Sequence, residues 1–245
     1  MKKLLLLVLV VGPAFSQAQQ FIQKGKIEFE RKINIHKQFD EQEGEWIQEL
    51  KKTIPQYNIT YFNLFFDGNK SVYRPGRDNS ENNKSAGWGD GPAKENVVVN
   101  DYEQQQSISQ KQVFETTYLI QDSLKKIEWK LTSDTRKIAG FNCRKATGII
   151  MDSVFVFAFY TDEILVTGGP EGFNGLPGMI LGIAIPRMYT TWFATKLELI
   201  EFNPKDMAVP TKGKKTNINE LMTTLQSTMK EWGKWGHRNI WQIML

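Results

Sequence analysis

The chain has 245 residues, of which 31 are lysine or arginine and 27 are acidic, giving a formal net charge of +4. A charge so close to balance argues against strong electrostatic capture of nucleic acid or of an anionic membrane. A single cysteine excludes an intramolecular disulfide, so a hydrophobic core has to stabilise the folded chain.

Residues 1–18 have the three parts of a secretory signal peptide. Lys2 and Lys3 form a basic start, an apolar run extends from Leu4 to Val11, and Ala18 fits the small-residue rule for cleavage. A membrane-spanning helix needs roughly 17–25 apolar residues, so this run is too short to be an anchor. We therefore expect an exported protein in the periplasm, at the outer membrane or outside the cell. Its mature chain, residues 19–245, is expected to form one domain without a transmembrane segment.

The N-terminal part of the mature chain alternates between strand and turn patterns. Residues 25–39 place apolar side chains at every second position, which is typical of a half-buried strand in an antiparallel sheet. Residues 40–54 change to helical spacing, and Pro55 ends the predicted helix. Two strand-like runs on either side of Asp67 and Gly68 predict a β-hairpin. Residues 75–96 are rich in glycine and polar groups, so we expect a long mobile loop there.

Short strand-like runs at turn-sized intervals between residues 97 and 160 predict an antiparallel meander. The runs are VVVN, FETTYLI, KIEWKL (residues 126–131), RKIAGFNCRKATGII and SVFVFAFYT. Two runs, residues 154–160 and 179–185, are apolar on both faces. A strand in a sheet with one solvent-exposed face would be apolar on one face only. Either helices cover the second face, or that face lines an apolar groove. For a groove, the candidate ligand-binding residues are Phe155, Phe157, Phe159, Ile180 and Trp192.

The C-terminal part predicts one more strand over residues 189–202 and a helix over residues 217–232. Asn217 fits a helix N-cap with Glu220 three residues later, and apolar side chains recur at helical spacing until Gly233. The tail that follows is too apolar to remain in water, so we expect it to dock on the domain.

The most distinctive segment is residues 168–185, GGPEGFNGLPGMILGIAI. Pro177 presets φ and Gly178 accepts a positive φ, so this pair favours a type II turn. The segment is either a corner that leads back into the sheet or a rim loop at the mouth of a groove. The corner is favoured, because only Glu171 has a side chain suited to chemistry. The residues of this signature turn are Gly172, Phe173, Gly175, Leu176, Pro177 and Gly178.

Within this segment, GFNGLPGMILGI resembles the signature of the GLPGLI family. The runs WKLTSDTRKIAGFNCRKAT and FAFYTDEI resemble neighbouring regions of that family, so the likeness extends over residues 22–232. The resemblance implies an exported envelope protein of a Gram-negative bacterium, with no established biochemical role. By analogy it implies a lipoprotein-carrier-like fold, with a hydrophobic cavity in a strongly curved sheet closed by helices. We therefore expect an α+β, mostly β, fold: one large curved antiparallel sheet with a few helices covering one face.

No motif of a known catalytic site is present. The two histidines, His36 and His237, lack the closely spaced partners of a zinc site, and there is neither a Gly-x-Ser-x-Gly elbow nor a phosphate-binding loop. Cys143 is expected to be a buried structural thiol rather than a nucleophile. We therefore expect no metal, no cofactor and no enzymatic activity.

Three functions stay open on the sequence alone. The first is non-enzymatic binding of an apolar ligand, a lipid or an acyl chain, in the groove of a curved sheet. The second is an accessory role in contact with an outer-membrane transporter. The third and weakest is a hydrolase with an unfamiliar acidic site at Asp162, Glu163 and Glu171. The partners implied are a lipid or an outer-membrane protein, and nucleic acid is not expected.

Overall fold

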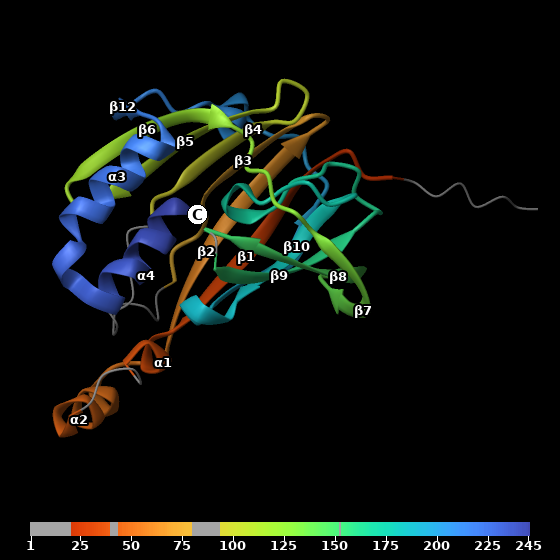
Figure 1. Ribbon diagram of the computed structural model, residues 1–245. Coiled ribbons are helices and arrows are strands. Elements are labelled where there is room, and N and C mark those ends of the chain that lie inside the picture. The colour runs from red at the N-terminus through yellow and green to blue at the C-terminus, as the bar shows by residue number, and fades with distance from the viewer. Residues whose placement is uncertain (1–20, 40–43, 80–93, 152) are drawn as a thin grey trace, which may run out of the picture.

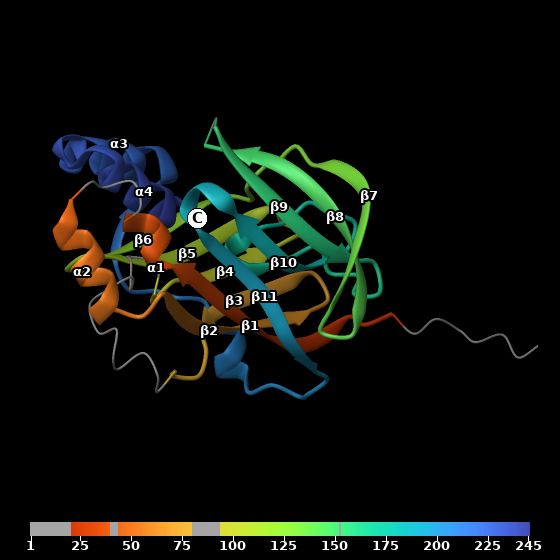
Figure 2. The ribbon, with the colours of Figure 1, turned by 90° about the horizontal axis from the view of Figure 1, so that it is seen from below.

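The computed structural model describes residues 21–39, 44–79, 94–151 and 153–245 (Figure 1). These residues form one strongly curved sheet of twelve strands in the order β12-β6-β5-β4-β3-β2-β1-β11-β10-β9-β8-β7, with β12 and β7 at its two edges (Figures 1 and 2). The strands are β1 (Lys24–Asn34), β2 (Tyr57–Asp67), β3 (Lys70–Pro75), β4 (Val97–Asp101), β5 (Gln106–Val113), β6 (Thr116–Ser123), β7 (Lys130–Ile138), β8 (Phe141–Ile150), β9 (Val154–Thr161), β10 (Met179–Ile185), β11 (Thr190–Glu198) and β12 (Lys214–Thr216).

The expected fold class, a curved and mostly antiparallel sheet with a few helices, is confirmed. Strand pairs along the sheet are antiparallel, except that the short β12 runs parallel to β6, which the sequence did not predict. The helices of the described residues are α1 (Ile35–Phe39), α2 (Glu45–Thr53), α3 (Ile218–Thr228) and α4 (Gly233–Met244). Figure 1 shows α3 and α4 lying over the concave side of β4, β5 and β6.

Two predicted segments fall outside the described residues. These are the signal peptide over residues 1–18 and most of the loop expected over residues 75–96. The organisation of the mature chain as a single domain likewise stays a prediction.

Strand β1 forms over the first part of the predicted range 25–39, but it ends at Asn34, and residues 35–39 form α1 instead. Ile27 and Phe29 of β1 are fully buried, because β1 lies in the middle of the sheet between β2 and β11. The predicted hairpin is also present: Asp67 pairs with Lys70, and Gly68 takes a φ of 54° in the tight turn between β2 and β3.

In the meander, one predicted strand was wrong and one strand was missed. Residues 126–131 were expected to form a strand, but β7 begins only at Lys130. Strand β5 was not predicted, because its inward positions carry serine and lysine instead of apolar side chains. Alternation of apolar side chains detects only strands whose inward positions are apolar, so it did not detect β5.

The C-terminal segment forms two helices instead of the single one expected over residues 217–232. The Asn217 side chain accepts a hydrogen bond from the Glu220 amide at 2.9 Å, as predicted for the N-cap. α3 ends at Thr228, and α4 begins at Gly233, which takes a φ of 53°. The apolar tail docks as expected, because Ile243 of α4 packs with α3 against the sheet.

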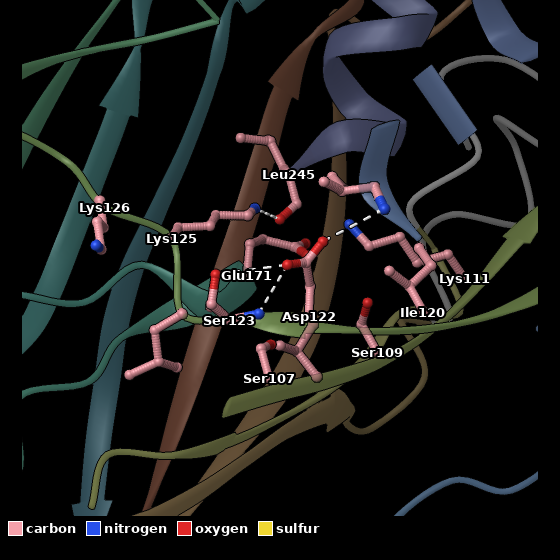
Figure 3. Close-up of a pocket in the computed structure, with 14 residues that line it drawn as sticks. Ser107, Ser109, Lys111, Ile120, Asp122, Ser123, Lys125, Lys126, Glu171 and Leu245 are labelled. Atoms are coloured by element: carbon pink, nitrogen blue, oxygen red, sulfur yellow. Dashed lines mark hydrogen bonds between the residues drawn. The ribbon is translucent and has the colours of Figure 1, made fainter. Parts of the chain in front are cut away.

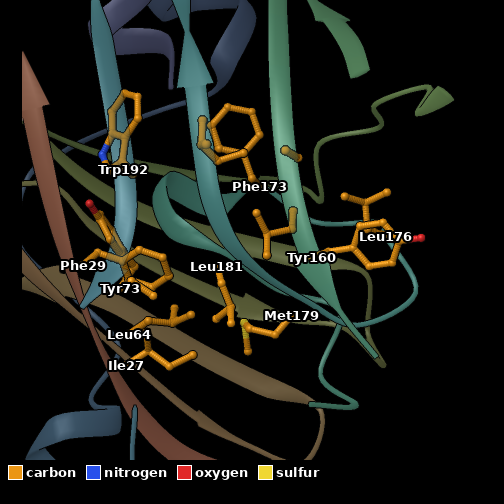
Figure 4. Close-up of a cluster of buried hydrophobic side chains, with 14 of the residues drawn as sticks. Ile27, Phe29, Leu64, Tyr73, Tyr160, Phe173, Leu176, Met179, Leu181 and Trp192 are labelled. Carbon is orange, nitrogen blue, oxygen red and sulfur yellow. The ribbon is translucent and has the colours of Figure 1, made fainter. Parts of the chain in front are cut away.

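The main hydrophobic core lies on the inner face of β1, β2, β9, β10 and β11 (Figure 4). Cys143 lies in this core with no exposed surface, which confirms the predicted buried thiol, and burial raises its pKa to about 11. The strand β10 is buried on both faces, as its sequence indicated. The strand β9 is not: Phe155 on its second face is 57% exposed.

The signature turn has the predicted positive φ at Gly178, which is 130°, but not the predicted hydrogen bond of a type II turn. The amide of Gly178 donates to the Leu176 carbonyl at 2.8 Å, which closes a three-residue turn. The amide of Met179 donates to the Ile164 carbonyl instead of to the turn. The turn is therefore tighter than expected, and it leads directly into β10.

Candidate functional site

A pocket of about 330 Å³ lies between the concave face of β4, β5 and β6 and the C-terminal helices (Figure 3). Its wall also includes the stretch after β6 and the short helix η2 (Pro170–Gly172), which belongs to the signature segment. The lining residues are Val98, Ser107, Ser109, Lys111, Ile120, Asp122, Ser123, Leu124, Lys125, Lys126, Glu171, Gly172, Ile218 and Leu245.

Strand β5 gives this pocket its polar floor. Ser107, Ser109 and Lys111 occupy alternate positions, so they point to the same face of the strand. The pairing register sets Ser107 opposite Asn100 of β4 on one side and opposite Asp122 of β6 on the other. Paired residues share a face of the sheet, so three neighbouring strands direct polar side chains into one concave surface.

Glu171 is fully buried at the edge of the pocket. Its backbone lies in the left-handed region with a φ of 51°, and Gly172 follows with a φ of 76°. The Tyr73 hydroxyl donates to Glu171 Oε1 at 3.4 Å, and the Asn96 amide Nδ2 donates to Oε2 at 3.1 Å. A left-handed conformation is uncommon for a residue with a side chain and is often found at functional sites. Here it brings a carboxylate among inward-facing strand residues.

Two lysine amines reach the same pocket from β5 and from the stretch after β6. Lys111 Nζ donates to the Ile243 carbonyl at 2.8 Å, and Lys125 Nζ donates to the Met244 carbonyl at 3.1 Å. Burial lowers the pKa of Lys111 to about 8, against the attraction of Glu171. Burial, followed by repulsion from Lys111, lowers the pKa of Lys125 well below its ordinary value. The Lys111 amine therefore titrates closer to neutral pH than an exposed lysine does.

Asp122 is the second acidic residue of the pocket lining. Its Oδ1 accepts a hydrogen bond from the Ser123 amide at 2.8 Å, and its Oδ2 accepts one from the Ile218 amide at 3.4 Å (Figure 3). Ile218 is the first residue of α3, so the carboxylate lies at a helix end where amide groups lack partners within the helix. This contact ties α3 to the wall of the pocket.

The pocket thus combines carboxylates, amines and hydroxyl groups in one concave site. Titratable groups with shifted pKa values in a cleft mark a candidate functional site. Acid–base catalysis is most effective when the pKa of the acting group lies near the working pH, a condition that Lys111 approaches. The same donors and acceptors suit a molecule rich in hydroxyl groups, whereas the closed apolar cavity implied by the lipoprotein-carrier analogy would lack them.

The predicted ligand-binding residues do not line this pocket, and the structure does not bring them together. Ile180 and Trp192 are buried in the core, with 0% and 1% of their surface exposed. Phe155, Phe157 and Phe159 lie on the opposite, partly exposed face of β9. Their role in binding a ligand stays a prediction.

The signature turn divides between the core and the pocket. Phe173 and Leu176 are buried in the core, whereas Gly175 and Pro177 are exposed. Gly172 lines the pocket, and a Cβ there would lie 3.2 Å from a methyl group of Val98. The segment is therefore a corner of the sheet, as favoured from the sequence, and its first part also supplies the pocket.

The three acidic residues considered together in the sequence lie in different surroundings. Asp162 is exposed and pairs with Arg144 at 3.0 Å, and Glu163 is only half-buried. Glu171 alone of the three lies in the pocket.

Sequence reasoning missed most of the pocket, including both lysines, Asp122 and the serines. The one local signal is the run QSISQKQV, where serine, serine and lysine recur at every second position. Of the two histidines, His36 contacts the Ile54 carbonyl at 3.1 Å and His237 is exposed. Among the residues that the structure describes, no three histidine, cysteine or acidic side chains gather as a metal site requires. No helix of the described chain is long and apolar enough to cross a membrane.

Comparison with known families gives one match. The family described as "N-glycanase peptide, N-terminal domain" matches residues 82–223, which is more than half of the chain. This finding overturns the resemblance to the GLPGLI family, which the short GFNGLPGMILGI run suggested. No protein of the curated set matches the chain.

Two solved structures of PNGF-II, in space groups P21 and C2, share the fold. Their TM-scores are 0.52 and 0.53, at 16% and 17% sequence identity, and each match covers 86% of this chain. The matches cover 34% and 33% of the PNGF-II chains, so this chain spans about one third of their length. At such identity the likeness shows the fold alone.

The family match also corrects the functional expectations. An N-glycanase domain points to an enzyme, so the expectations of a non-enzymatic binder of apolar ligands and of no enzymatic activity were wrong. The accessory role at an outer-membrane transporter has no support either.

Proposed function

Because the chain belongs to the family of N-glycanase N-terminal domains, we propose that it acts in the enzymatic release of N-linked glycans and engages its glycosylated substrate at the pocket under α3 and α4. The observation that carries this proposal is the pocket itself. A carboxylate, two amines with lowered pKa values and serine hydroxyls converge in about 330 Å³, in a domain of this family.

Sugars present many hydroxyl groups, each of which both donates and accepts hydrogen bonds. Glu171 and Asp122 offer acceptor oxygens, and Lys111 and Lys125 offer donors, so the pocket supplies both kinds of partner. Pockets that bind small molecules start at about 300 Å³, so this one suits one or two sugar rings. The rest of a glycan and its peptide would lie outside it.

We assign Glu171 as the group that contacts the substrate. Release of an N-linked glycan by water breaks a bond to nitrogen, so a base has to accept a proton from water and an acid has to protonate the leaving nitrogen. A carboxylate held by Tyr73 and Asn96 is suited to the first task. The Lys111 amine, with a pKa of about 8, is suited to hold or return a proton near neutral pH.

The proposed site of action lies outside the cytoplasm. We propose that the protein works in the periplasm or after secretion, where glycoproteins from the surroundings are accessible. Its whole activity is proposed for the chain together with any domain that accompanies it, since it spans about one third of the solved PNGF-II chains.

The test is to incubate the protein with a fluorescent N-glycopeptide and to follow glycan release by mass spectrometry and binding by anisotropy. We expect the glycopeptide to bind more tightly than the same peptide without its glycan. The Glu171→Gln variant should lower the rate of release by about 10²-fold or more, since it removes a proton acceptor at nearly constant size.

The matched control is Glu163→Gln, which makes the same chemical change in a half-buried residue of the preceding stretch, outside the pocket. It should leave release and binding unchanged. A protein that releases no glycan and does not distinguish glycopeptide from peptide would contradict the proposal.

A further inference from the structure

Two half-exposed aromatic rings meet outside the pocket, where the hairpin between β5 and β6 contacts the helices. Phe114 lies in the turn of this hairpin, and Trp232 lies in the short helix η5 (Lys230–Trp232) between α3 and α4. The ring centroids are 5.7 Å apart at an interplanar angle of 65°, which is an edge-to-face contact. Phe114 is 51% exposed and Trp232 is 46% exposed, so both rings still offer surface to a ligand.

The backbone conformation at Phe114 is unfavourable for a phenylalanine. Val113 pairs with Thr116, so Phe114 and Glu115 form a two-residue turn, and φ at Phe114 is 53°. Glycine is preferred at such a position, because a Cβ crowds the backbone in the left-handed region. A bulky residue at positive φ is unusual, and such residues are often found at functional sites. Neither local backbone preference nor complete burial accounts for a phenyl ring at this turn.

A hydrophobic cluster separates the ring pair from the pocket. Val113, the neighbour of Phe114 in β5, is buried together with Leu221 and Leu225 of α3. The pocket lies at the other end of α3, where Ile218 begins the helix. α3 has 11 residues, so about 16 Å of helix lies between its two ends. The two rings therefore form a surface of their own.

A sugar ring fits this surface by its chemistry. The C–H groups on one face of a pyranose carry a small positive charge, so this face is attracted to the negative face of an aromatic ring. Glu115 follows Phe114, and Lys230 and Glu231 precede Trp232; all three side chains are exposed and suit the hydroxyls at the edge of a sugar.

Two other classes of partner fit the ring pair less well. Its charged neighbours in the sequence are two acids, Glu115 and Glu231, and one base, Lys230, so they offer no excess positive charge to an anionic lipid surface. A stable protein interface buries about 1,200 Å² or more in total, whereas two half-exposed rings offer only a small part of that area.

We propose that Phe114 and Trp232 form a second sugar-binding site, on which the C–H face of a pyranose stacks. The choice of a sugar rests on the proposed function. A glycoprotein with several glycans would place one glycan on the ring pair while another occupies the pocket. Binding at two linked sites raises the overall affinity without any new contact in the pocket.

The test uses two probes, chitotetraose and mannitol. Chitotetraose is a linear oligomer of β-linked N-acetylglucosamine, whereas mannitol is an open-chain polyol with hydroxyl groups but no ring face. Tryptophan fluorescence follows the titrations, because Trp232 is exposed and the described lining of the pocket contains no tryptophan. We expect chitotetraose to shift the fluorescence in a saturable manner and mannitol to leave it unchanged.

The decisive variant is Phe114→Gly, which removes one ring and keeps Trp232 as the reporter. It should weaken chitotetraose binding by about fivefold, the effect of losing one aromatic contact. Its melting temperature should stay within about 3 °C of the wild type, because relief of the positive φ offsets the lost ring contact. The matched control is Phe155→Ala, which removes an exposed ring from β9 and should leave binding unchanged.

Trp232→Ala tests the other ring by calorimetry and by activity. It should weaken chitotetraose binding by about fivefold and slow glycan release from a glycoprotein with several glycans. Release from a glycopeptide with a single glycan should not change. Trp46→Ala, at an exposed position of α2, is the matched control and should behave as the wild type.

Unchanged chitotetraose binding in Phe114→Gly or Trp232→Ala would overturn the inference, and so would a wild-type protein that does not bind this probe. A fall of more than about 3 °C in the melting temperature of Phe114→Gly would assign the ring to packing. Ring-dependent binding of phosphatidylglycerol vesicles without sugar binding would replace the sugar by a lipid surface.

The two proposals fail separately. If chitotetraose binds through the rings but no glycan is released from any glycopeptide, the proposed function fails and the second site stands. If glycan is released and both ring variants bind chitotetraose as the wild type does, the second site fails and the proposed function stands.

Discussion

The concave side of the sheet differs between its two ends. Under β1, β2 and β9–β11 it is filled by large apolar side chains such as Phe29 and Trp192, which are almost completely buried. Under β4–β6 it carries serine, asparagine, lysine and aspartate, and a pocket remains between these side chains and α3 and α4. We call these regions the apolar half and the polar half. The same strand geometry thus forms a core in one half and a site in the other.

The signature segment joins the two halves. Phe173 and Leu176 enter the apolar half, and Glu171 enters the polar half only two residues before Phe173. Between the two halves, the backbone of Glu171 takes a left-handed conformation within η2, with a φ of 51°. The signature segment therefore supplies side chains both to the hydrophobic core and to the candidate site.

The largest effect is expected from truncation in the apolar half. Phe29→Ala should lower the free energy of unfolding by about 3–5 kcal/mol, because it leaves a cavity where a fully buried ring packs. Ser109→Ala, in the polar half, should change it by only about 0.5 kcal/mol. Urea unfolding of both variants measures the difference. Comparable losses would mean that the two halves do not differ in their contribution to stability.

A second effect should come from the turn that joins the halves. Gly178→Ala places a Cβ against the Thr161 carbonyl at a φ of 130°, so we expect a loss of about 2–4 kcal/mol from overlap and backbone strain. The control is Gly140→Ala, where φ is 91° and no atom lies within 4 Å of the new methyl group. It should cost only about 1–2 kcal/mol. Equal losses in urea unfolding would show that positive φ alone, and not the close contact, makes glycine necessary at position 178.

The apolar half was largely predictable from the sequence and the polar half was not. The sequence predicts β1, β2 and β10 because each contains apolar side chains that have to be buried. β5 shows no such signal, since its inward positions are Ser107, Ser109 and Lys111. The pocket forms only when register aligns three strands and α4 folds back over them. The pocket residues lie between positions 98 and 245, and no local sequence pattern indicates that they come together.

The smallest effect is a pH dependence that only the polar half should show. The pKa of Lys111 is lowered from 10.5 to about 8 in the folded protein, so between these values the unfolded chain binds more protons than the folded one. Stability therefore rises with pH in this window, because the cost of a buried cation is lost as Lys111 deprotonates. We expect a gain of about 1–2 kcal/mol between pH 7 and about 9.5, measured by urea unfolding.

The contributions of other titratable groups near Lys111 to the pH dependence of stability have to be separated from that of Lys111. Lys125, whose pKa is also lowered, adds to the rise in the wild-type protein, whereas Tyr73, whose pKa is raised by burial and by Glu171, lowers stability only above about pH 10. The difference between the wild type and Lys111→Met contains the Lys111 part and the repulsion that Lys111 exerts on Lys125, so it should be at least the 1–2 kcal/mol given above. Lys137→Met, at an exposed site, should follow the wild type. Parallel curves for Lys111→Met and the wild type would mean that the Lys111 amine is solvated in the folded protein, and the polar half would then lack a buried cation.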